Sequence, residues 1–170
     1  DIGSSTGMST GVLRYFNVAG ADPKGRAGQS TSNATHLIKV CVEAAAGKRP
    51  YVEIFGDDFP TKDGTGVRDF IHVADLISAH IATLDALTRD ASNLVLNCGY
   101  GRGFSVLDVI QATERVRGRK IEVRWSPRRP GDLSRVVADG SRLRAELGWE
   151  PEYENLESII EHALLDIGGE

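Results

Sequence analysis

The amino-acid sequence predicts a mixed α/β fold, and three observations support this class. Short apolar runs bounded by glycine, proline or polar residues are typical of strands. They alternate with longer segments in which apolar residues recur every three or four positions, the spacing of a helix that packs on one face. The composition, with 41% hydrophobic and 26% charged residues, is ordinary for a globular protein. Alternating strands and helices are typical of α/β sheets, which bind ligands at the carboxyl ends of their strands.

Length and charge exclude several kinds of protein. The 170 residues suffice for one ordinary domain, or the larger part of one, with a sizeable core. A net charge of -4 and the lack of a Lys/Arg cluster on any predicted helix argue against a nucleic-acid partner. No apolar run has the length of a membrane span or the pattern of a signal peptide, so we expect a cytoplasmic protein without a membrane partner.

The chain contains two cysteines, Cys41 and Cys98. Both stand in apolar surroundings and lack the spacing of metal ligands. We therefore expect small buried thiols in a reducing compartment, and we predict neither a metal site nor a catalytic thiol.

Strands are predicted over residues 12–18, 51–55, 94–98 and 121–125, and the first is expected to be buried. Helices are predicted over 35–46, 74–87, 141–147 and 156–167, with Gly47 and Gly148 ending two of them. The helix over 74–87 is expected to pack through Leu76, Ile77, Ile81, Leu84 and Leu87, with His80 on the same face. His80 is therefore interpreted as a packed histidine rather than a ligand.

The glycine-rich segment 99–103 admits two interpretations. It follows a predicted strand and precedes a helix, as the glycine fingerprint of dinucleotide-binding folds does. However, Phe104 stands where that fingerprint needs its third glycine. The interpretation that we favour is a tight turn into a helix capped by Ser105, with Asp108 completing a capping box.

An acidic, glycine-rich loop over residues 56–66 has the character of a ligand loop. Its glycines permit close approach of a ligand, and Arg68, at the start of a segment 67–73 expected to open a helix, offers a planar fork of donors suited to phosphate. Arg128 and Arg129 lie between two prolines, which reduces the entropy lost when they bind an anion. The alternative for all three arginines is a solvated surface. Asn17, at the end of the first strand, either faces a ligand or caps the next turn.

The order of residues decides between these alternatives. Residues 56–73, GDDFPTKDGTGVRDFIHV, closely resemble the substrate-domain signature of UDP-glucose 4-epimerases, in the extended short-chain dehydrogenase/reductase superfamily. The resemblance extends, in the family's order, to LRYFNVAGA at 13–21, NCGYGRGFSV at 97–106, RRPGD at 128–132 and ELGW at 146–149. It implies the C-terminal part of a Rossmann-like fold together with a smaller α/β substrate-binding lobe.

The resemblance also implies a ligand and the residues that hold it. The family binds a UDP-sugar, uses NAD and commonly forms homodimers when intact. Carried over by position, the substrate-binding residues are Asn17, Thr35, His36, Leu37, Phe55, Arg68, Phe70, Arg129, Asp132 and Val136. Two departures stand out: Thr35 and His36 replace a pair that is commonly Asn-Asn, and Phe70 replaces a frequent Tyr. Val136 stands where residue size decides whether N-acetylated sugars are admitted, although a β-branched residue chosen for strand packing would look the same.

Two parts of the family's chemistry have no counterpart in the sequence. The complete glycine fingerprint for NAD is missing, and so is the Tyr-x-x-x-Lys pair in which Tyr acts as base: Ala19, Phe55, Phe104 and Glu157 stand four residues after the four tyrosines. We therefore expect residues 1–170 to be a single C-terminal fragment, without catalytic residues, that is inactive alone and does not retain NAD. The alternatives are a fragment of another nucleotide-sugar epimerase or dehydratase, or a non-catalytic nucleotide-sugar-binding remnant.

Overall fold

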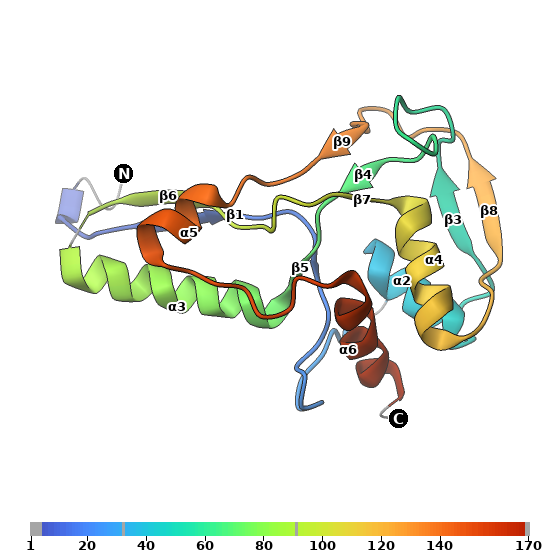
Figure 1. The fold of residues 1–170 in the computed structure, drawn as a ribbon, viewed down its shortest axis with the longest axis horizontal. Coiled ribbons are helices and arrows are strands. Elements are labelled where there is room, and N and C mark those ends of the chain that lie inside the picture. Colours follow the sequence, from blue (N-terminus) through green and yellow to red (C-terminus); the bar gives the residue numbers. More distant parts are fainter. Residues whose placement is uncertain (1–4, 32, 91, 169–170) are drawn as a thin grey trace.

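The protein is an elongated α/β molecule in a computed structural model that describes residues 5–31, 33–90 and 92–168 (Figure 1). In chain order the elements are β1 (Gly11–Arg14), β2 (Val18–Ala19), α2 (Leu37–Ala45), β3 (Val52–Phe55), β4 (Val67–Arg68), β5 (Ile71–His72), α3 (Val73–Asp90), β6 (Leu94–Asn97), β7 (Phe104–Ser105), α4 (Val106–Arg117), β8 (Val123–Ser126), β9 (Arg135–Val136), α5 (Ser141–Leu147) and α6 (Leu156–Gly168). None of the helices in these ranges is long and apolar enough to cross a membrane.

The strands form four small sheets. Three are parallel pairs, β1 with β6, β2 with β5 and β3 with β8. The fourth has the order β7-β4-β9, in which β4 is antiparallel to β7 and parallel to β9. Helices α3 and α5 lie with β1 and β6 at one end of the molecule, and α2, α4 and α6 lie with β3 and β8 at the other (Figure 1).

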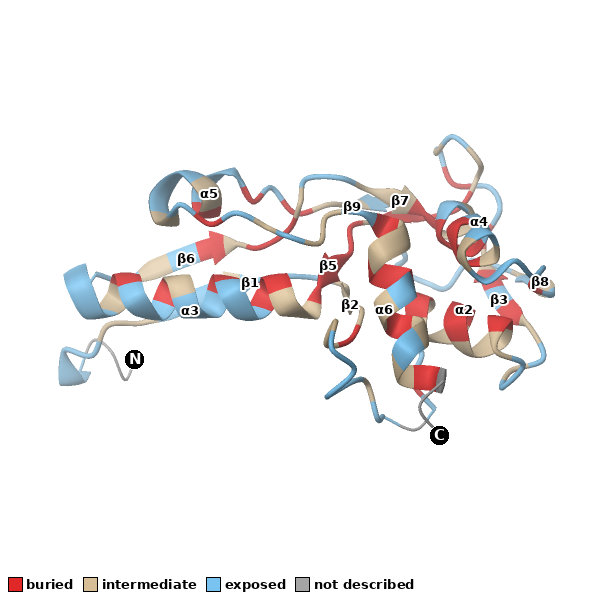
Figure 2. Ribbon diagram, turned by 60° about the horizontal axis from the view of Figure 1, so that its bottom comes forward, coloured by how far each residue is buried: buried red, intermediate tan, exposed pale blue. Residues whose placement is uncertain are grey.

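Each end of the molecule has its own hydrophobic cluster. The larger one packs buried residues of α2, α4 and α6 against β3, with Val42, Val109 and Ile159 fully buried. The smaller one joins α3, α5 and β6 through Leu76, Leu96 and other buried residues. Buried residues alternate with intermediate and exposed ones along these helices (Figure 2). The larger cluster fixes the relative positions of α2 and β3, between which the candidate site lies.

Local sequence signals place several helix ends. The side chain of Ser105 accepts a hydrogen bond from the backbone N–H of Asp108, and the Asp108 carboxylate accepts one from the backbone N–H of Ser105. The predicted capping box is therefore confirmed. Helix α5 covers the predicted residues and ends at Gly148, whose φ of 63° is in the left-handed region that glycine adopts easily.

The two cysteines are free and buried, as predicted. Cys41 lies in the larger cluster and Cys98 in the smaller one. Burial raises the pKa of each thiol to about 12, so both are protonated at neutral pH. A protonated thiol is a poor nucleophile, which agrees with a packing role.

One prediction about a strand and one about the start of a helix differ from the structure. Residues 12–18 do not form one buried strand: β1 ends at Arg14 and β2 begins at Val18, because the two pair with different partners, β6 and β5. Most of β1 is exposed, since β6 is its only neighbour among the described strands. The segment 67–73 opens a helix only with its last residue: it first forms the short strands β4 and β5, and α3 begins at Val73.

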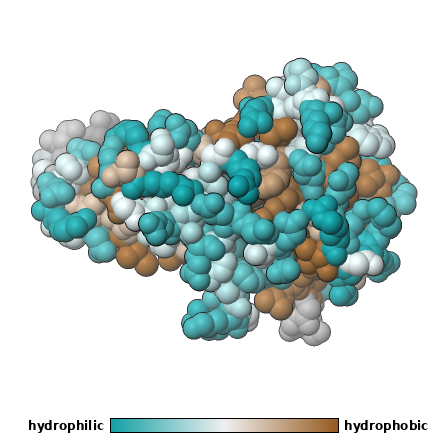
Figure 3. Space-filling model, viewed as in Figure 1, coloured by the Kyte–Doolittle hydropathy of each residue, from teal (hydrophilic) through white to brown (hydrophobic). Residues whose placement is uncertain are grey.

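The predicted packing face of α3 is only partly right: Leu76 is buried and Leu87 lies close to Gly11, but the other predicted residues do not pack. The helix buries Leu76, Ala79, Thr83 and Ala86, whereas Ile77, Ile81 and Leu84 are exposed. His80 is exposed too and is not a packed histidine. The small residues face β1 closely: a side chain at Gly11 would collide with Thr83, 2.5 Å away. Hydrophobic surface is accordingly visible along the lower edge of the region that contains α3 (Figure 3).

Candidate functional site

A pocket of about 740 Å³ lies between the start of α2, strand β3 and the segments that follow β3 and β8. Nine of the ten residues singled out from the sequence line it: Asn17, Thr35, His36, Leu37, Phe55, Arg68, Phe70, Arg129 and Asp132. They come from five separate stretches of the chain, at residues 17, 35–37, 55, 68–70 and 129–132. Only the tertiary fold brings them together.

Val136 is the exception, since it is not among the residues that line the pocket. It is half-buried in β9 and pairs with Arg68 of β4. Residues paired across neighbouring strands point to the same side of the sheet. Val136 therefore lies on the same face as a residue that does line the pocket, and its interpretation as a strand residue is confirmed.

Half of the pocket wall was not anticipated from the sequence. The additional residues are Val40, Arg49, Pro50, Tyr51, Val52, Glu53, Phe59, Gly66 and Val106. Phe59 and Gly66 stand in the loop that the sequence marks as a ligand loop. Arg49, by contrast, follows a helix end without any motif, and it lines the pocket because it is anchored by the carboxylate of Glu43 and donates to the Ala34 carbonyl at 2.8 Å. No pattern in the sequence indicates that anchor.

The N-terminus of α2 forms part of the pocket wall. Thr35 and His36 are exposed, and His36 is the N-cap residue, with an extended backbone and no capping hydrogen bond from its side chain. The first turn of α2 contains no acidic residue. Free backbone N–H groups and the positive end of the helix dipole favour an anion at such a terminus.

Asn17, just before β2, links two of the chain segments that line the pocket. Its side-chain amide donates to the carbonyl of Asp69 at 2.9 Å, and its own carbonyl accepts from the N–H of Ile71 at 2.9 Å. These bonds tie the end of the first segment to the link between β4 and β5. The side chain of Asn17 thus does not cap a turn of its own segment, which was one of the two interpretations of this residue.

The loop over 56–66 is internally ordered rather than loosely solvated. The carboxylate of Asp63 accepts from the N–H of Thr65 at 2.9 Å, from the Thr65 hydroxyl at 2.8 Å and from the Ser105 hydroxyl at 2.5 Å. Burial alone would raise the pKa of Asp63, but these hydrogen bonds outweigh it and lower the pKa. Gly64 has a φ of 79° and passes so close to the Asp57 carbonyl that a Cβ would lie 2.0 Å from its oxygen. Only glycine fits there.

Three arginines line the pocket; Arg49 is already engaged by Glu43 and Ala34, and the other two are Arg68 and Arg129. One Nη of Arg68 donates to the Val67 carbonyl at 2.9 Å, and the other lies 3.8 Å from the carboxylate of Asp132. The guanidinium of Arg129 lies over the ring of Phe55, 3.9 Å from its centroid. Within the described part of the chain, Arg129 has neither an ion pair nor a side-chain hydrogen bond. Its donors are therefore available to an anion, and the neighbouring ring offers a surface on which a flat group can stack.

The chemistry of the pocket is that of binding. Its wall combines arginine donors, a helix N-terminus, an amide and aromatic rings, and it contains no lysine. In the described ranges no group of three or more His, Cys, Asp or Glu side chains could hold a metal ion. The arrangement suits a ligand with both a diphosphate and a flat ring.

The glycine-rich segment 99–103 forms a turn that leads into β7 and α4. A side chain at Gly99 would lie 2.6 Å from the Asp69 carboxylate, and one at Gly103 would lie 2.6 Å from Val67. Both glycines make room for the protein's own side chains, whereas a Cβ at Gly101 would meet nothing within 4 Å. The interpretation of this segment as a turn into α4 is therefore supported.

The family model of the NAD dependent epimerase/dehydratase family matches residues 1–99. The chain belongs to this family. Among curated relatives, the UDP-glucose 4-epimerase of Azospirillum brasilense is 49% identical over 96% of this chain and 47% of its own length. The chain thus spans about half the length of the curated relatives it matches.

Two solved structures of the family show the same fold. The UDP-glucose 4-epimerase from Brucella ovis in complex with NAD superposes with a TM-score of 0.94 at 39% identity, over 99% of this chain and 52% of that one. The UDP-Glc/GlcNAc 4-epimerase from Campylobacter jejuni gives a TM-score of 0.79 at 48% identity, over 95% of this chain and 49% of that one. These comparisons confirm the resemblance and the fold class predicted from the sequence.

Proposed function

We propose that this chain is the UDP-sugar-binding part of a UDP-glucose 4-epimerase, an isomerase that interconverts UDP-glucose and UDP-galactose. The observation that carries the proposal is the pocket in which Arg68, Arg129 and Phe55 converge beside the N-terminus of α2. Cations and a helix N-terminus suit the diphosphate, and an aromatic face suits the uracil. The similarity to relatives that bear this name supports the same conclusion.

Each candidate residue has a role in the proposal. Arg68 and Arg129 bind the diphosphate, and Phe55 lies against the base. Asn17 and the stretch from Thr35 to Leu37 contact the nucleotide, with Asp132 orienting Arg68 at 3.8 Å. Phe70 is 3% exposed and lacks a hydroxyl, so it contributes shape but no hydrogen bond.

We further propose that residues 1–170 form one unit that works with a partner segment supplying NAD binding and the catalytic base. The exposed surface supports this arrangement. Parallel sheets are normally covered on both faces, yet Val12 of β1 and Val95 of β6 are 47% and 46% exposed. On α3, Ile77 and Leu84 are 54% and 61% exposed. In full-length relatives the part that this chain does not span would cover these residues, and a homodimer of the intact enzyme is part of the same proposal.

The experiment that tests this function compares two proteins. The chain alone is expected to show neither interconversion of UDP-glucose and UDP-galactose nor bound NAD. A chimera carries, ahead of this chain, the part of the Azospirillum brasilense enzyme that the chain does not span, and it is expected to show both. Activity or stoichiometric NAD in the chain alone would overturn the division of labour. A folded, NAD-bound chimera that does not bind UDP would overturn the role of the pocket.

A further inference from the structure

Two consecutive arginines of the segment after β8 lie on two aromatic rings, one at the end of β3 and one in the loop that follows it. Arg129 covers Phe55, and Arg128 covers Phe59 with its guanidinium 4.0 Å from the ring centroid. Arg128 makes two further contacts: its Nε donates to the carboxylate of Asp58, and an Nη donates to the Asp58 carbonyl. We call the three residues Arg128, Asp58 and Phe59 the clasp.

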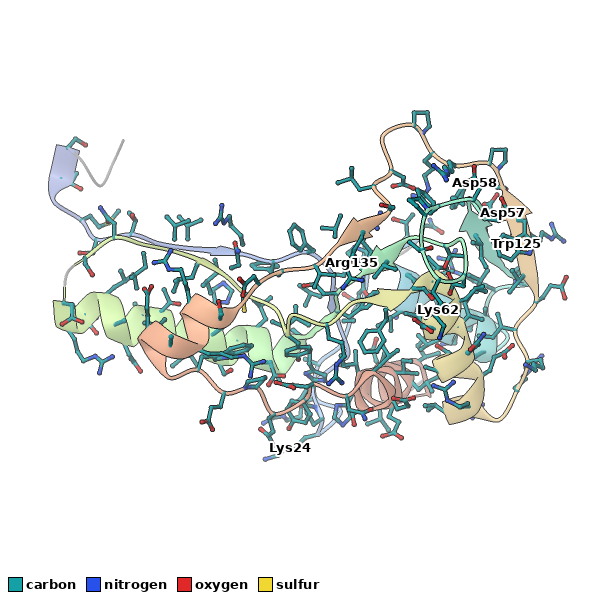
Figure 4. The ribbon with its side chains drawn as sticks, turned by 45° about the horizontal axis from the view of Figure 1, so that its top comes forward. Lys24, Asp57, Asp58, Lys62, Trp125 and Arg135 are labelled. Carbon is teal, nitrogen blue, oxygen red and sulfur yellow. The ribbon has the colours of Figure 1, made fainter. Side chains whose placement is uncertain are left out.

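The clasp joins the two segments that follow the carboxyl ends of β3 and β8, which are neighbouring parallel strands. Strands β3 and β8 are parallel, with Phe55 paired to Ser126, and the N–H of Gly56 donates to the Ser126 carbonyl at 2.8 Å. Beyond that bond the two segments diverge. Figure 4 shows Asp57 and Asp58 in the loop beyond β3, close to the end of β8 that carries Trp125. The clasp is the next connection between them.

Other attachments of the segment 127–131 are few. Of these five residues, all of which the structure describes, only Arg128 forms side-chain hydrogen bonds. The proline residues at 127 and 130 have no N–H to donate. Asp132 donates its N–H to the Arg129 carbonyl at 3.2 Å, a bond within the segment itself. The position of the segment over the pocket therefore depends on the clasp and on the stacking of Arg129.

Gly56 leaves room in the loop for the side chain of Arg128. It has a φ of 86°, and a Cβ at this position would lie 2.5 Å from Cγ of Arg128 and 2.8 Å from the ring of Phe59. The absence of a side chain leaves the space through which the stem of Arg128 passes to reach Asp58. A left-handed glycine at this point thus serves both the turn and the clasp.

The two arginines differ in what they can touch. Arg129 lines the pocket, whereas neither Arg128 nor Asp58 does. We propose that Arg128 is a positioning residue: through the clasp it holds the segment 127–132 so that Arg129 stays over Phe55 and faces the pocket without a ligand. That this arrangement serves a bound ligand rests on the proposed function, whereas the claim that the clasp holds the segment 127–132 in place does not.

The size of the effect follows from the exposure of the clasp. An exposed ion pair alone contributes little, and Asp58 and Arg128 have side chains that are 70% and 38% exposed. Arg128, however, combines a pair of hydrogen bonds to one residue with a stacked ring, and it acts on a segment whose ordering would otherwise have to accompany binding. Ordering a segment in advance strengthens binding by reducing that entropy loss. We expect a change in UDP affinity of about threefold to tenfold when the clasp is broken.

The first part of the test needs no ligand. Hydrogen exchange of the chain is compared for the wild type, Arg128→Ala, Asp58→Ala and Asp57→Asn. The first two substitutions should speed exchange in residues 127–134 and 56–60 and leave β3 unchanged. Asp57 has no part in the clasp, so Asp57→Asn is the matched control and should behave as the wild type. Unchanged exchange in Arg128→Ala, or the same acceleration in Asp57→Asn, would overturn the clasp.

The second part titrates the same proteins, and the double variant Arg128→Ala/Asp58→Ala, with UDP. Arg128→Ala removes every contact of the clasp and should weaken UDP binding most, whereas Asp58→Ala leaves the Asp58 backbone carbonyl and the Phe59 ring in place and should weaken it less. The double variant should be no weaker than Arg128→Ala alone, because both substitutions act on the same contacts. Asp58→Asn, which keeps the size of the side chain, should give a smaller loss. Faster exchange with unchanged UDP affinity would show that the clasp does not position Arg129 and would overturn the proposal. Failure of the wild type to bind UDP would refute the proposed function, and the exchange data would still decide whether the clasp holds the segment.

Discussion

The guanidinium of Arg129 lies 3.9 Å from the centroid of the Phe55 ring, across the mouth of the pocket. One residue follows β8 and the other ends β3, and these two strands are paired in parallel. The carboxyl ends of neighbouring parallel strands thus bring a cation and an aromatic ring to the same place, where α/β folds generally bind ligands.

The first prediction concerns the two arginines of the pocket. If Arg68 and Arg129 bind the diphosphate, Arg68→Ala and Arg129→Ala should each weaken UDP binding by about 1.5–3 kcal/mol, the usual contribution of a hydrogen bond to a charged group. Arg117→Ala, at the exposed end of α4, is the matched control and should leave affinity unchanged. Isothermal titration calorimetry measures the difference. Equal and negligible losses at Arg68 and Arg129 would identify both as surface charges.

The second prediction concerns the size of the sugar. Val136 shares a face with Arg68, its partner in β4, and in the family resemblance its position decides whether N-acetylated sugars are admitted. Val136→Tyr should weaken binding of UDP-N-acetylglucosamine and leave that of UDP-glucose largely intact, because only the larger sugar meets the added bulk. Paired titrations with the two nucleotide sugars provide the measurement. A substitution that lowers both affinities alike, or neither, would show that Val136 only packs in its strand.

The third prediction concerns the order of the loop over 56–66. Asp63→Asn removes an acceptor of the hydrogen bonds from Thr65 and Ser105 and should lower the free energy of unfolding by about 1–3 kcal/mol at neutral pH. Because the pKa of Asp63 is lowered in the folded state, its contribution is present above the pKa of the unfolded chain and disappears as the pH falls through the folded pKa. The stabilities of wild type and variant, measured by urea unfolding, should converge at low pH. A constant difference down to acid pH would contradict this role.

The fourth prediction concerns His72, a fully buried histidine of β5. The N–H of Ala74 donates to its Nδ1 at 3.0 Å, which leaves Nε2 to donate to Nδ1 of His162 at 3.0 Å. Burial, together with the electrostatic effect of the neighbouring His162 ring, lowers the pKa of His72 to about 4, although Asp75 opposes the shift. The unfolded chain therefore binds a proton below about pH 6.5 that the folded chain does not.

Stability should in consequence fall as the pH decreases from about 6.5 towards 4, by up to about 1.4 kcal/mol per pH unit from this group. His72→Gln should flatten that slope, whereas His80→Gln, on the exposed side of α3, should not. Urea unfolding at several pH values measures the slopes. The same slope in His72→Gln as in the wild type would show that another group is responsible.

Signals confined to a few neighbouring residues predicted the local structure well. Ser105 and Asp108 define the start of α4, Gly148 the end of α5, and the apolar stripe of α6 is buried at Ile159 and Ile160. Each of these features is decided by hydrogen bonds or packing within one or two turns of helix. The neighbouring residues in the sequence are therefore sufficient to predict these features.

Features that depend on distant partners could not be predicted in this way. The periodicity of α3 correctly indicates a helix, but which face is buried depends on β1, where Gly11 leaves room for Thr83 and Leu87. The break after Arg14 arises because β6 and β5 are separate partners. Arg49 enters the pocket through contacts with Glu43 and the Ala34 carbonyl. Resemblance to a family, not local physics, grouped the nine residues that line the pocket, and their contact with a ligand stays a prediction.

The central claim, that this pocket binds UDP, is tested most directly by a nuclear magnetic resonance titration of the isotope-labelled chain with UDP. If the pocket binds UDP, saturable shifts should appear in backbone amides around it, at the start of α2, along β3, and in the segments containing Arg68 and Arg129. Uridine should shift the amides near Phe55 with much weaker affinity, because it lacks the diphosphate. No saturable shift with UDP, or shifts that gather on α3 and α5 instead, would contradict the account.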